Sequence, residues 1–381
     1  MPVPFFRIYA NGVDITGPLS GGEISLTITD GVGMNADTAE IEIDDKDGVI
    51  APPKVGATLR IVAGYIDDYR DFGDYIVDEV SLDGWPQKIT ISAQSASARS
   101  ALKQLRPKAY KPPDYRTYGD IFAEIAGRNG LQLSISNEIR SIELDYESQS
   151  EEDDASFATR LGDELSAAVS IKNGRLIVVD EGEGASAGGQ QLPTIAVIGD
   201  VNVLSYNVSR QSKARHKRVK AHWYDRKKKK KEEVEEPAGN DGPDFVIRNP
   251  HRSQAKAKRA ARAKARRLKR KEASASFEIV GDPHARAEAM VMVTRVRSLV
   301  DGAWRATRVN HKWSATSAYS TSLECELPNS GGSASPPVSS KANPKGPNVQ
   351  QVALPDEAPT PTPSPGGPVT GIGDLPGDGP E

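Results

Sequence analysis

Cysteine is almost absent from the sequence, because Cys325 is the only one in 381 residues. A single cysteine cannot form a disulfide within the chain, and no cluster of cysteine with histidine offers a zinc site, so we expect folding in a reducing cytoplasm. The chain also lacks any uninterrupted apolar run of about eighteen residues, the length of a membrane span. Met1–Ala10 has Arg7 within its short apolar run and no small-residue cleavage site, so neither a signal peptide nor a membrane anchor is expected.

Motifs of the common hydrolases and nucleotide-binding enzymes are missing as well. There is no Gly-x-Ser-x-Gly, P-loop or His-Glu-x-x-His, and Gly188-Gly189 precedes no strand-to-helix transition of a phosphate-binding kind. The histidines, candidates for a base or a metal ligand, are His216, His222, His251, His284 and His311. On a shared strand His216 and His222 would lie about 20 Å apart, too far for one ion. Surface or interface imidazoles are favoured, and we assign no catalytic, cofactor-binding or metal-binding residue.

Two acidic stretches could be taken for active-site or calcium ligands. Glu151–Asp154 could supply the carboxylate pair of a glycosidase. Carboxylates in a first helical turn also stabilise the helix N-terminus, however, and Ser150 with Asp153 resembles a capping box. Asp44–Asp47 fits a turn better than a calcium loop, because the glutamate that completes such a loop is missing. Structural roles are favoured for both stretches.

The net charge of −3 conceals a strong segregation of charge. Residues 210–271 are heavily basic, whereas the regions before and after them are mostly acidic. Within this segment, 252–271 is predicted to be a basic helix with a narrow apolar stripe, formed by Ala257, Ala261, Ala265 and Leu268. Such a helix could bind nucleic-acid phosphates. Alternatively, the stripe packs on a β-barrel while the charged face is solvated or meets acidic surfaces of a neighbouring ring, which is favoured because no aromatic residues interleave with the charges.

Residues 5–95 alternate apolar and polar side chains with period two, as in Ile24, Leu26 and Ile28 and again in Ile41 and Ile43. Further alternating runs are 59–63, 75–82 and 89–93. The intervening pairs Asn11-Gly12, Asp47-Gly48 and Asp83-Gly84 are expected to supply the positive φ angles of tight turns. Short antiparallel strands at this spacing predict a barrel or a sandwich.

The middle of the chain changes to helical periodicity. One helix is predicted from Thr117 to Asn129-Gly130 and another from about Glu151 to Ala167, and residues 170–180 predict a hairpin with Asn173-Gly174 at its turn. This region, 106–185, is therefore predicted to be a small α+β domain.

Strand alternation returns at 201–209 and 218–224, after a linker rich in glycine, alanine and serine. An insertion near 225–272, made of a polar excursion and the basic helix, interrupts the strands before they resume at 275–280, 289–299, 305–313 and 321–327. From Pro328 the chain is rich in proline, glycine, serine and threonine, which predicts a disordered tail. The predicted domains are 1–105, 106–185, 186–328 and the tail 329–381.

A series of stretches resembles, in order, the late control D proteins of contractile-tailed phages, which are related to the hub half of VgrG spike proteins. The stretches are ITISAQSASARSALKQL (89–105), TYGDIFAEIAGRNGL (117–131), QSEEDDASFATRLGDELSAAVSIKNGRL (149–176), VKAHWYD (219–225), Gly281-Asp282-Pro283 and LVDGAWRATRVNHKWS (299–314). The third is the most specific, since the Phe, two residues and Arg-Leu of the family form are matched by Phe157, Arg160 and Leu161. The resemblance covers residues 3–328 and leaves Lys227–Lys231 and the tail outside its pattern.

This resemblance implies a structural protein rather than an enzyme: the baseplate hub of a contractile tail, with two tail-tube-like antiparallel β-barrels and an α+β domain between them. Three chains would form a ring of six barrels, on which a hexameric tail tube and a trimeric central spike dock at opposite faces. Other implied partners are a tube-terminal protein, further baseplate proteins and the tape-measure protein. DNA would pass through a polar, non-cationic lumen without specific binding. The implied location is the virion tail baseplate, after assembly in the host bacterial cytoplasm.

Two alternatives stay open, a tail-tip cell-wall hydrolase and a DNA-binding protein that uses the helix 252–271. The ring requires the two strand-rich segments to be copies of one barrel. Unrelated topologies for these segments, or their merger into one sheet, would remove its geometric basis.

Overall fold

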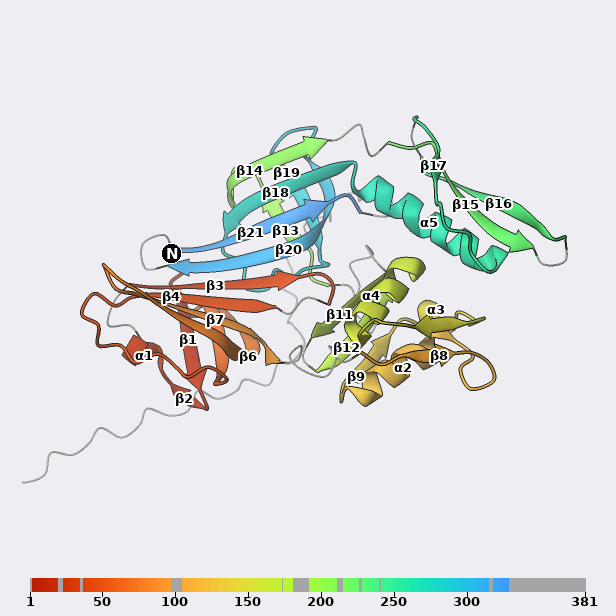
Figure 1. Ribbon diagram of the computed structural model, residues 1–381. Coiled ribbons are helices and arrows are strands. Elements are labelled where there is room, and N and C mark those ends of the chain that lie inside the picture. Colours follow the sequence, from red (N-terminus) through yellow and green to blue (C-terminus); the bar gives the residue numbers. More distant parts are fainter. Residues whose placement is uncertain are drawn as a thin grey trace, which may run out of the picture. The chain divides into compact units, whose positions relative to one another are not determined.

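Strands dominate the structure, a computed structural model (Figure 1). It describes residues 2–19, 23–34, 37–96, 105–172, 174–180, 192–210, 215–225, 228–239, 241–314 and 318–328, all within the unit Met1–Pro336. The predicted disordered tail, the linker and Gly188-Gly189 lie outside the described residues. None of the described helices is at once long and apolar enough to span a membrane. The predicted class, α+β with mostly β-structure, is confirmed.

The first strand unit consists of β1 (Pro4–Ala10), β2 (Val13–Asp14), β3 (Ile24–Gly31), β4 (Thr38–Asp44), β5 (Thr58–Tyr65), β6 (Asp68–Asp83) and β7 (Lys88–Ser95), with α1 (Thr16–Leu19) between β2 and β3. Its strands pair antiparallel in the order β3-β4-β7-β6-β5-β1-β2. Alternate residues such as Leu26, Ile41 and Ile91 are buried, as the period-two pattern predicts. Asn11, Gly12 and Gly48 have the expected positive φ, whereas Gly84 does not.

The second strand unit consists of β13 (Ile195–Ile198), β14 (Val203–Arg210), β18 (Ala273–Val280), β19 (Met290–Thr294), β20 (Gly302–Ser314) and β21 (Ala318–Glu326). Its pairing order, β14-β18-β21-β20-β19-β13, repeats the order β3-β4-β7-β6-β5-β1 of the first unit. Even the β-bulge recurs, between Val77 and Glu79 of β6 and between Ala306 and Arg308 of β20. One pairing differs, because β13 runs parallel to β19. The predicted duplication is thus present in strand order.

The two units are joined by strand pairing, which the sequence did not predict. Residues 308–314 of β20 pair antiparallel with 25–31 of β3, so one hydrogen-bonded sheet runs through both units (Figure 1). Among the described residues, strand pairing closes neither unit into a barrel. The cores remain largely separate, one between Ile8 and Ala93 that Trp313 and Tyr319 join from the second unit, the other between Ile195 and Cys325. The two strand units are therefore merged into one sheet, which the sequence analysis counted against a ring. Their cores nevertheless stay distinct, so the shared pairing is a joint between two units.

The middle domain is built from β8 (Lys108–Tyr110), α2 (Tyr118–Arg128), β9 (Gln132–Ile135), α3 (Asn137–Arg140), β10 (Glu147–Gln149), α4 (Asp154–Leu165), β11 (Ala167–Lys172) and β12 (Arg175–Asp180). Helix α2 begins after Thr117, which forms a capping box with Asp120. The N-cap of α4 is Asp153 rather than Ser150, because its carboxylate accepts a 2.7 Å hydrogen bond from the Ser156 N–H. The predicted hairpin is confirmed as β11 and β12. Together with α2 and α4, these strands enclose a separate core.

The insertion begins earlier than predicted. β15 (Arg218–Asp225), assigned from the sequence to the second strand unit, instead pairs with β16 (Lys230–Pro237) and β17 (Phe245–Val246) in a sheet of its own. Helix α5 (Gln254–Arg270) confirms the predicted basic helix. Its alanine stripe packs on Val219 and Ala221 of β15, not on a strand unit as favoured from the sequence. Short alanine side chains allow this close approach of helix and sheet.

Candidate functional site

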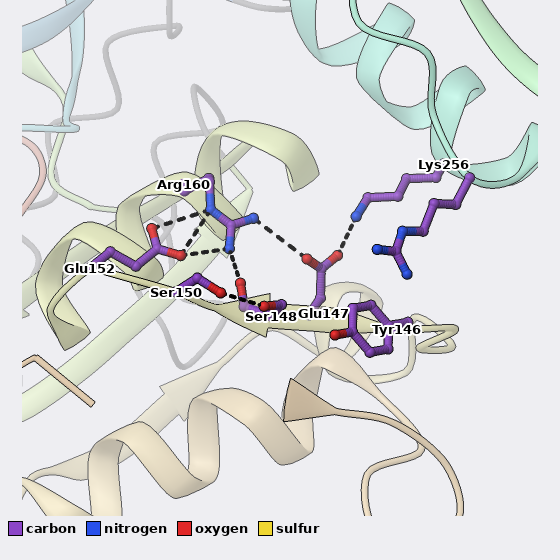
Figure 2. A pocket seen from close by; sticks show the side chains of 8 residues that line it. Tyr146, Glu147, Ser148, Ser150, Glu152, Arg160 and Lys256 are labelled. Carbon is purple, nitrogen blue, oxygen red and sulfur yellow. Dashed lines mark hydrogen bonds and ion pairs between the residues drawn. The ribbon is translucent and has the colours of Figure 1, made fainter. Parts of the chain in front are cut away.

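A polar cleft of about 350 Å³ lies between the middle domain and α5 (Figure 2). The residues that line it are Tyr146, Glu147, Ser148, Ser150, Glu152, Arg160, Arg252 and Lys256. They come from β10, from the segments beside it, from α4 and from the start of α5. The cleft thus lies where residues far apart in the sequence meet.

Glu147 is the centre of this cleft. Its carboxylate, 3% exposed, accepts hydrogen bonds from the Tyr118 hydroxyl at 2.8 Å, from Arg160 at 3.4 Å and from Lys256. Arg160 in turn bonds Glu152 at 2.8 Å and the Ser148 carbonyl at 2.9 Å. Burial opposes the charge of Arg160, but Glu152 and its other acidic neighbours raise its pKa. Since these charges are matched within the chain, the cleft is an ion-pair junction.

Three carboxylates of the acidic run at the start of α4 have structural roles. Glu152 pairs with Arg160, Asp153 caps the helix, and Asp154 is fully buried against Arg128. Burial opposes the ionisation of Asp154, but hydrogen bonds from Gln149, Asn129 and Arg128 outweigh it and lower its pKa. A glycosidase acid needs a raised pKa, so Asp154 has the opposite property.

The histidines do not converge. His284 pairs with Asp68 at 2.7 Å and His222 approaches Glu233 at 3.7 Å, while His216 contacts the Pro243 carbonyl at 3.0 Å. His311 is buried beside the Tyr319 hydroxyl at 2.8 Å, and burial lowers its pKa to about 3. His251 is half-buried, which lowers its pKa. Within the described ranges, no group of three histidine, cysteine or acidic side chains could hold a metal ion.

The aspartates 44–47 form a turn, as predicted. Asp44 pairs with Lys46 at 2.7 Å, and the Asp45 carboxylate accepts hydrogen bonds from the backbone N–H groups of Val49 at 3.0 Å and Ile50 at 3.3 Å. These contacts occupy the carboxylates locally.

Many cations of α5, and Arg252 just before it, contact this same chain. Ion pairs join Arg262 to Glu236 at 3.2 Å, Arg267 to Asp163 at 3.3 Å and Arg270 to Glu326 at 3.1 Å. Cation–π contacts place Arg252 over Tyr146, Arg259 over Tyr118 and Lys264 over Phe245. The charged face therefore meets acidic and aromatic groups of its own chain, whereas the sequence favoured solvent or a neighbouring ring. Helix α5 links the insertion, the middle domain and β21.

The continuous sheet presents one polar face across both strand units. Residues directly opposite in paired strands share a face. One row across seven strands is Ser205, Glu278, Ser322, Asn310, Thr29, Thr38 and Gln94. A parallel row is Ser320, Lys312, Thr27, Glu40, Ser92 and Glu79. We call this surface the polar face.

Charge on the polar face is mixed, and acidic side chains outnumber basic ones in the two rows. Arg308 pairs with Glu324 at 3.3 Å and Lys88 with Glu42 at 2.8 Å. Lys312 is a further positive charge on this face, and Glu40, Glu79 and Glu278 are further negative charges.

Comparison with known proteins agrees with these features. A sequence model of the family described as "Phage tail baseplate hub (GPD)" matches residues 95–317. The chain belongs to this family. The probable baseplate hub protein of Escherichia phage 186 is 31% identical to it, with 85% of this chain and 93% of that protein covered. The hub is thus a structural protein of a phage tail baseplate, located in the virion tail.

Solved structures share the fold of the hub. The 43 kDa tail protein of prophage MuSo2 from Shewanella oneidensis superposes with a TM-score of 0.65 at 13% identity, covering 86% of this chain and 99% of that one. A Francisella PdpA–VgrG complex gives 0.51 at 8% identity, covering 86% of this chain and 58% of that one. The resemblance to tail hubs and VgrG inferred from the sequence is therefore confirmed.

Sequence reasoning missed the pair of Glu147 and Lys256. The two residues lie 109 positions apart, and no local pattern relates them. It also missed the pairing of β3 with β20, since an alternation of apolar residues predicts a strand but does not predict its partner strand.

Proposed function

We propose that the hub forms a homotrimeric ring of six strand units that joins the hexameric tail tube to the trimeric central spike. The duplicated strand order carries this proposal, since three chains with two equivalent units each match sixfold symmetry on one side and threefold symmetry on the other. The tail tube subunit or a tube-terminal protein would dock on one face and the spike on the other. Further baseplate proteins and the tape-measure protein are the remaining partners, and assembly takes place in the host bacterial cytoplasm.

The pairing of β3 with β20 merges the two units into one sheet, the outcome that the sequence analysis counted against a ring, but the ring is still proposed because this pairing can act as a joint. It connects two units that keep largely distinct cores, through strands at non-equivalent positions of the repeated order. A contact between non-equivalent edges can repeat from unit to unit around a circle. The merged sheet is thus compatible with a ring, and its units share a hydrogen-bonded wall.

The polar face is the surface that we assign to the lumen. Its serine, threonine and glutamine side chains and its excess of acidic over basic side chains suit a channel through which DNA passes without adhering. The basic helix α5 lies outside this face, because it packs on β15 and α4.

We further propose that the hub has no enzymatic activity. The support is that three carboxylates of the acidic run at the start of α4, those of Glu152, Asp153 and Asp154, each take part in an ion pair or a helix cap. No observation within the described residues favours the hydrolase alternative or the DNA-binding alternative.

The mass of the purified full chain tests the ring. Light scattering should give three chains of 40.9 kDa, about 123 kDa in total, alone or with the co-purified central spike protein. Averaged electron micrographs of that species should show a ring with six similar lobes and a central hole. A monomer at all concentrations, with the spike protein present, would contradict the proposal.

A further inference from the structure

Among the strand edges that lack a partner strand within the described residues are those of β14 and of residues 79–83 of β6. β14 pairs with β18 alone, and residues 79–83 of β6 pair with β7 alone. Both edges carry exposed apolar side chains: Leu82 is 68% exposed, Leu204 58% and Tyr206 44%. Apolar strand edges promote association unless another chain covers them. These two edges are therefore candidate interfaces.

The duplication identifies the equivalents of these edges. One row of residues crosses each strand unit at the same strand positions. In the first unit the row is Leu26, Ile41, Ile91 and Val80, and in the second it is Tyr206, Phe277, Leu323 and Val309. The last strand of the row has Val80 in the first unit and Val309 in the second, so two residues further on Leu82 corresponds to His311. The first strand has Leu26 and Tyr206, so Ile28 corresponds to Val208. The free edge of β6 thus corresponds to the edge of β20 that pairs with β3, and β14 corresponds to β3.

The joint within the chain already contains the matching contact. His311 lies opposite Ile28 there, and both are buried. Of their equivalents, Leu82 is exposed and Val208 is partly buried against the core of its own unit, and the outer edge of β14 has no partner strand within the described residues. Every chain therefore carries the two edges needed to form a second joint of the same kind. One is residues 79–83 of β6 in the first unit, and the other is β14 in the second unit.

We propose that β14 of one hub chain pairs antiparallel with residues 79–83 of β6 in the next chain, repeating the joint between β3 and β20. This inference rests on the proposed ring and names the surface through which its chains meet. Leu82 lies opposite Val208, and Ser81 lies opposite Ser209. Since the two edges differ, the contact is heterologous and repeats until the third chain closes the ring.

The chemistry of both faces agrees with this register. Ser81 and Ser209 lie on the polar faces of their chains, so the polar face becomes continuous from chain to chain. Leu82 and Val208 lie on the opposite side, where the cores are. A shift of one residue would move Leu82 onto the polar face and expose it there. The register is therefore determined by the side chains as well as by the repeat.

Paired cysteines on separate full-length chains test the register. One tagged chain carries Ser81→Cys and an untagged chain carries Ser209→Cys, and a second mixture carries Leu82→Cys and Val208→Cys. Neighbouring antiparallel pairs alternate in their Cβ spacing, so one of the two mixtures has the spacing that favours a disulfide. Mild oxidation should give a two-chain band on a non-reducing gel for at least one mixture. Wild-type chains, whose Cys325 is buried, measure the background.

A shifted pair provides the matched control. Ser81→Cys mixed with Val208→Cys places the thiols on opposite faces of the paired strands and should stay at background. Leu82→Glu should abolish the trimer at a concentration at which Val13→Glu, at an equally exposed position of β2 (66%), retains it.

The outcomes separate this inference from the ring itself. Trimers that cross-link at the predicted pairs, and not at the shifted pair, support both. Trimers without these cross-links, or with equal cross-linking of the shifted pair, overturn the edge pairing and leave the ring intact. Monomers under all conditions, including with the spike protein, overturn both.

Discussion

Replacing Lys256 with methionine tests whether the ion-pair junction holds the insertion against the middle domain. Methionine keeps most of the aliphatic stem, so the packing of α5 changes little. Glu147 loses the ammonium group that points toward it (Figure 2). It retains the Tyr118 hydroxyl at 2.8 Å and Arg160 at 3.4 Å. The variant therefore leaves a buried carboxylate incompletely compensated.

The expected cost follows from this burial. Removing one partner of a buried ion pair costs about 3–5 kcal/mol. Arg160 still compensates part of the Glu147 charge, and Lys256 itself is partly exposed, so we expect about 2–3 kcal/mol. This loss corresponds to a fall of about 30- to 150-fold in the equilibrium that keeps α5 docked.

Hydrogen exchange in the full chain measures that equilibrium locally, because amides of α5 exchange when the insertion opens. Lys258→Met on the same helix is the control, since Lys258 is exposed and its replacement should change stability by less than about 0.5 kcal/mol. Equal protection of α5 in the two variants would refute the role of the junction. If the junction acts as proposed, the double variant Lys256→Met with Glu147→Gln should lose less docking free energy than the sum of the losses in the two single variants.

Two further variants test buried charges elsewhere. Burial, reinforced by Asp30, raises the pKa of Asp37 to about 6, so the folded protein holds a proton that the unfolded chain releases near pH 4. Relative to Asp37→Asn, the wild type should lose about 1–2 kcal/mol as the pH rises from about 4 to about 6; parallel urea-unfolding profiles would contradict this. Arg128→Met should destabilise the middle domain by about 3–5 kcal/mol, because it leaves fully buried Asp154 without its cation; thermal unfolding would disprove this if the loss were under about 1 kcal/mol.

Local patterns predicted most elements because burial within a strand or helix repeats with a short period. The alternation around Leu26 and Ile41 identified β3 and β4, and Thr117 located the start of α2. The N-cap of α4 was predicted at Ser150 but is Asp153. Both residue types can cap a helix, and the backbone conformation at the start of α4 determines which of them does so.

The assignment of β15 failed for a related reason. Its alternation of apolar and polar residues identifies a strand correctly, but two sheets compete for it. The alanine stripe of α5 offers it a second surface to pack on, and the pairing with β16 is close in sequence. A short loop favours the local pairing because its closure costs less entropy.

The sequence by itself determined the strand-rich composition, helices α2 and α4 of the middle domain, the basic helix and the order of motifs that the family shares. Each depends on neighbours a few residues apart, where side-chain period and capping act directly. Only the tertiary structure decided that β20 pairs with β3, that Lys256 meets Glu147 and that the polar rows of two strand units form one face. Those contacts depend on which backbone edges and charges are left free once each unit has folded, and that is a property of the assembled surface rather than of any stretch of chain.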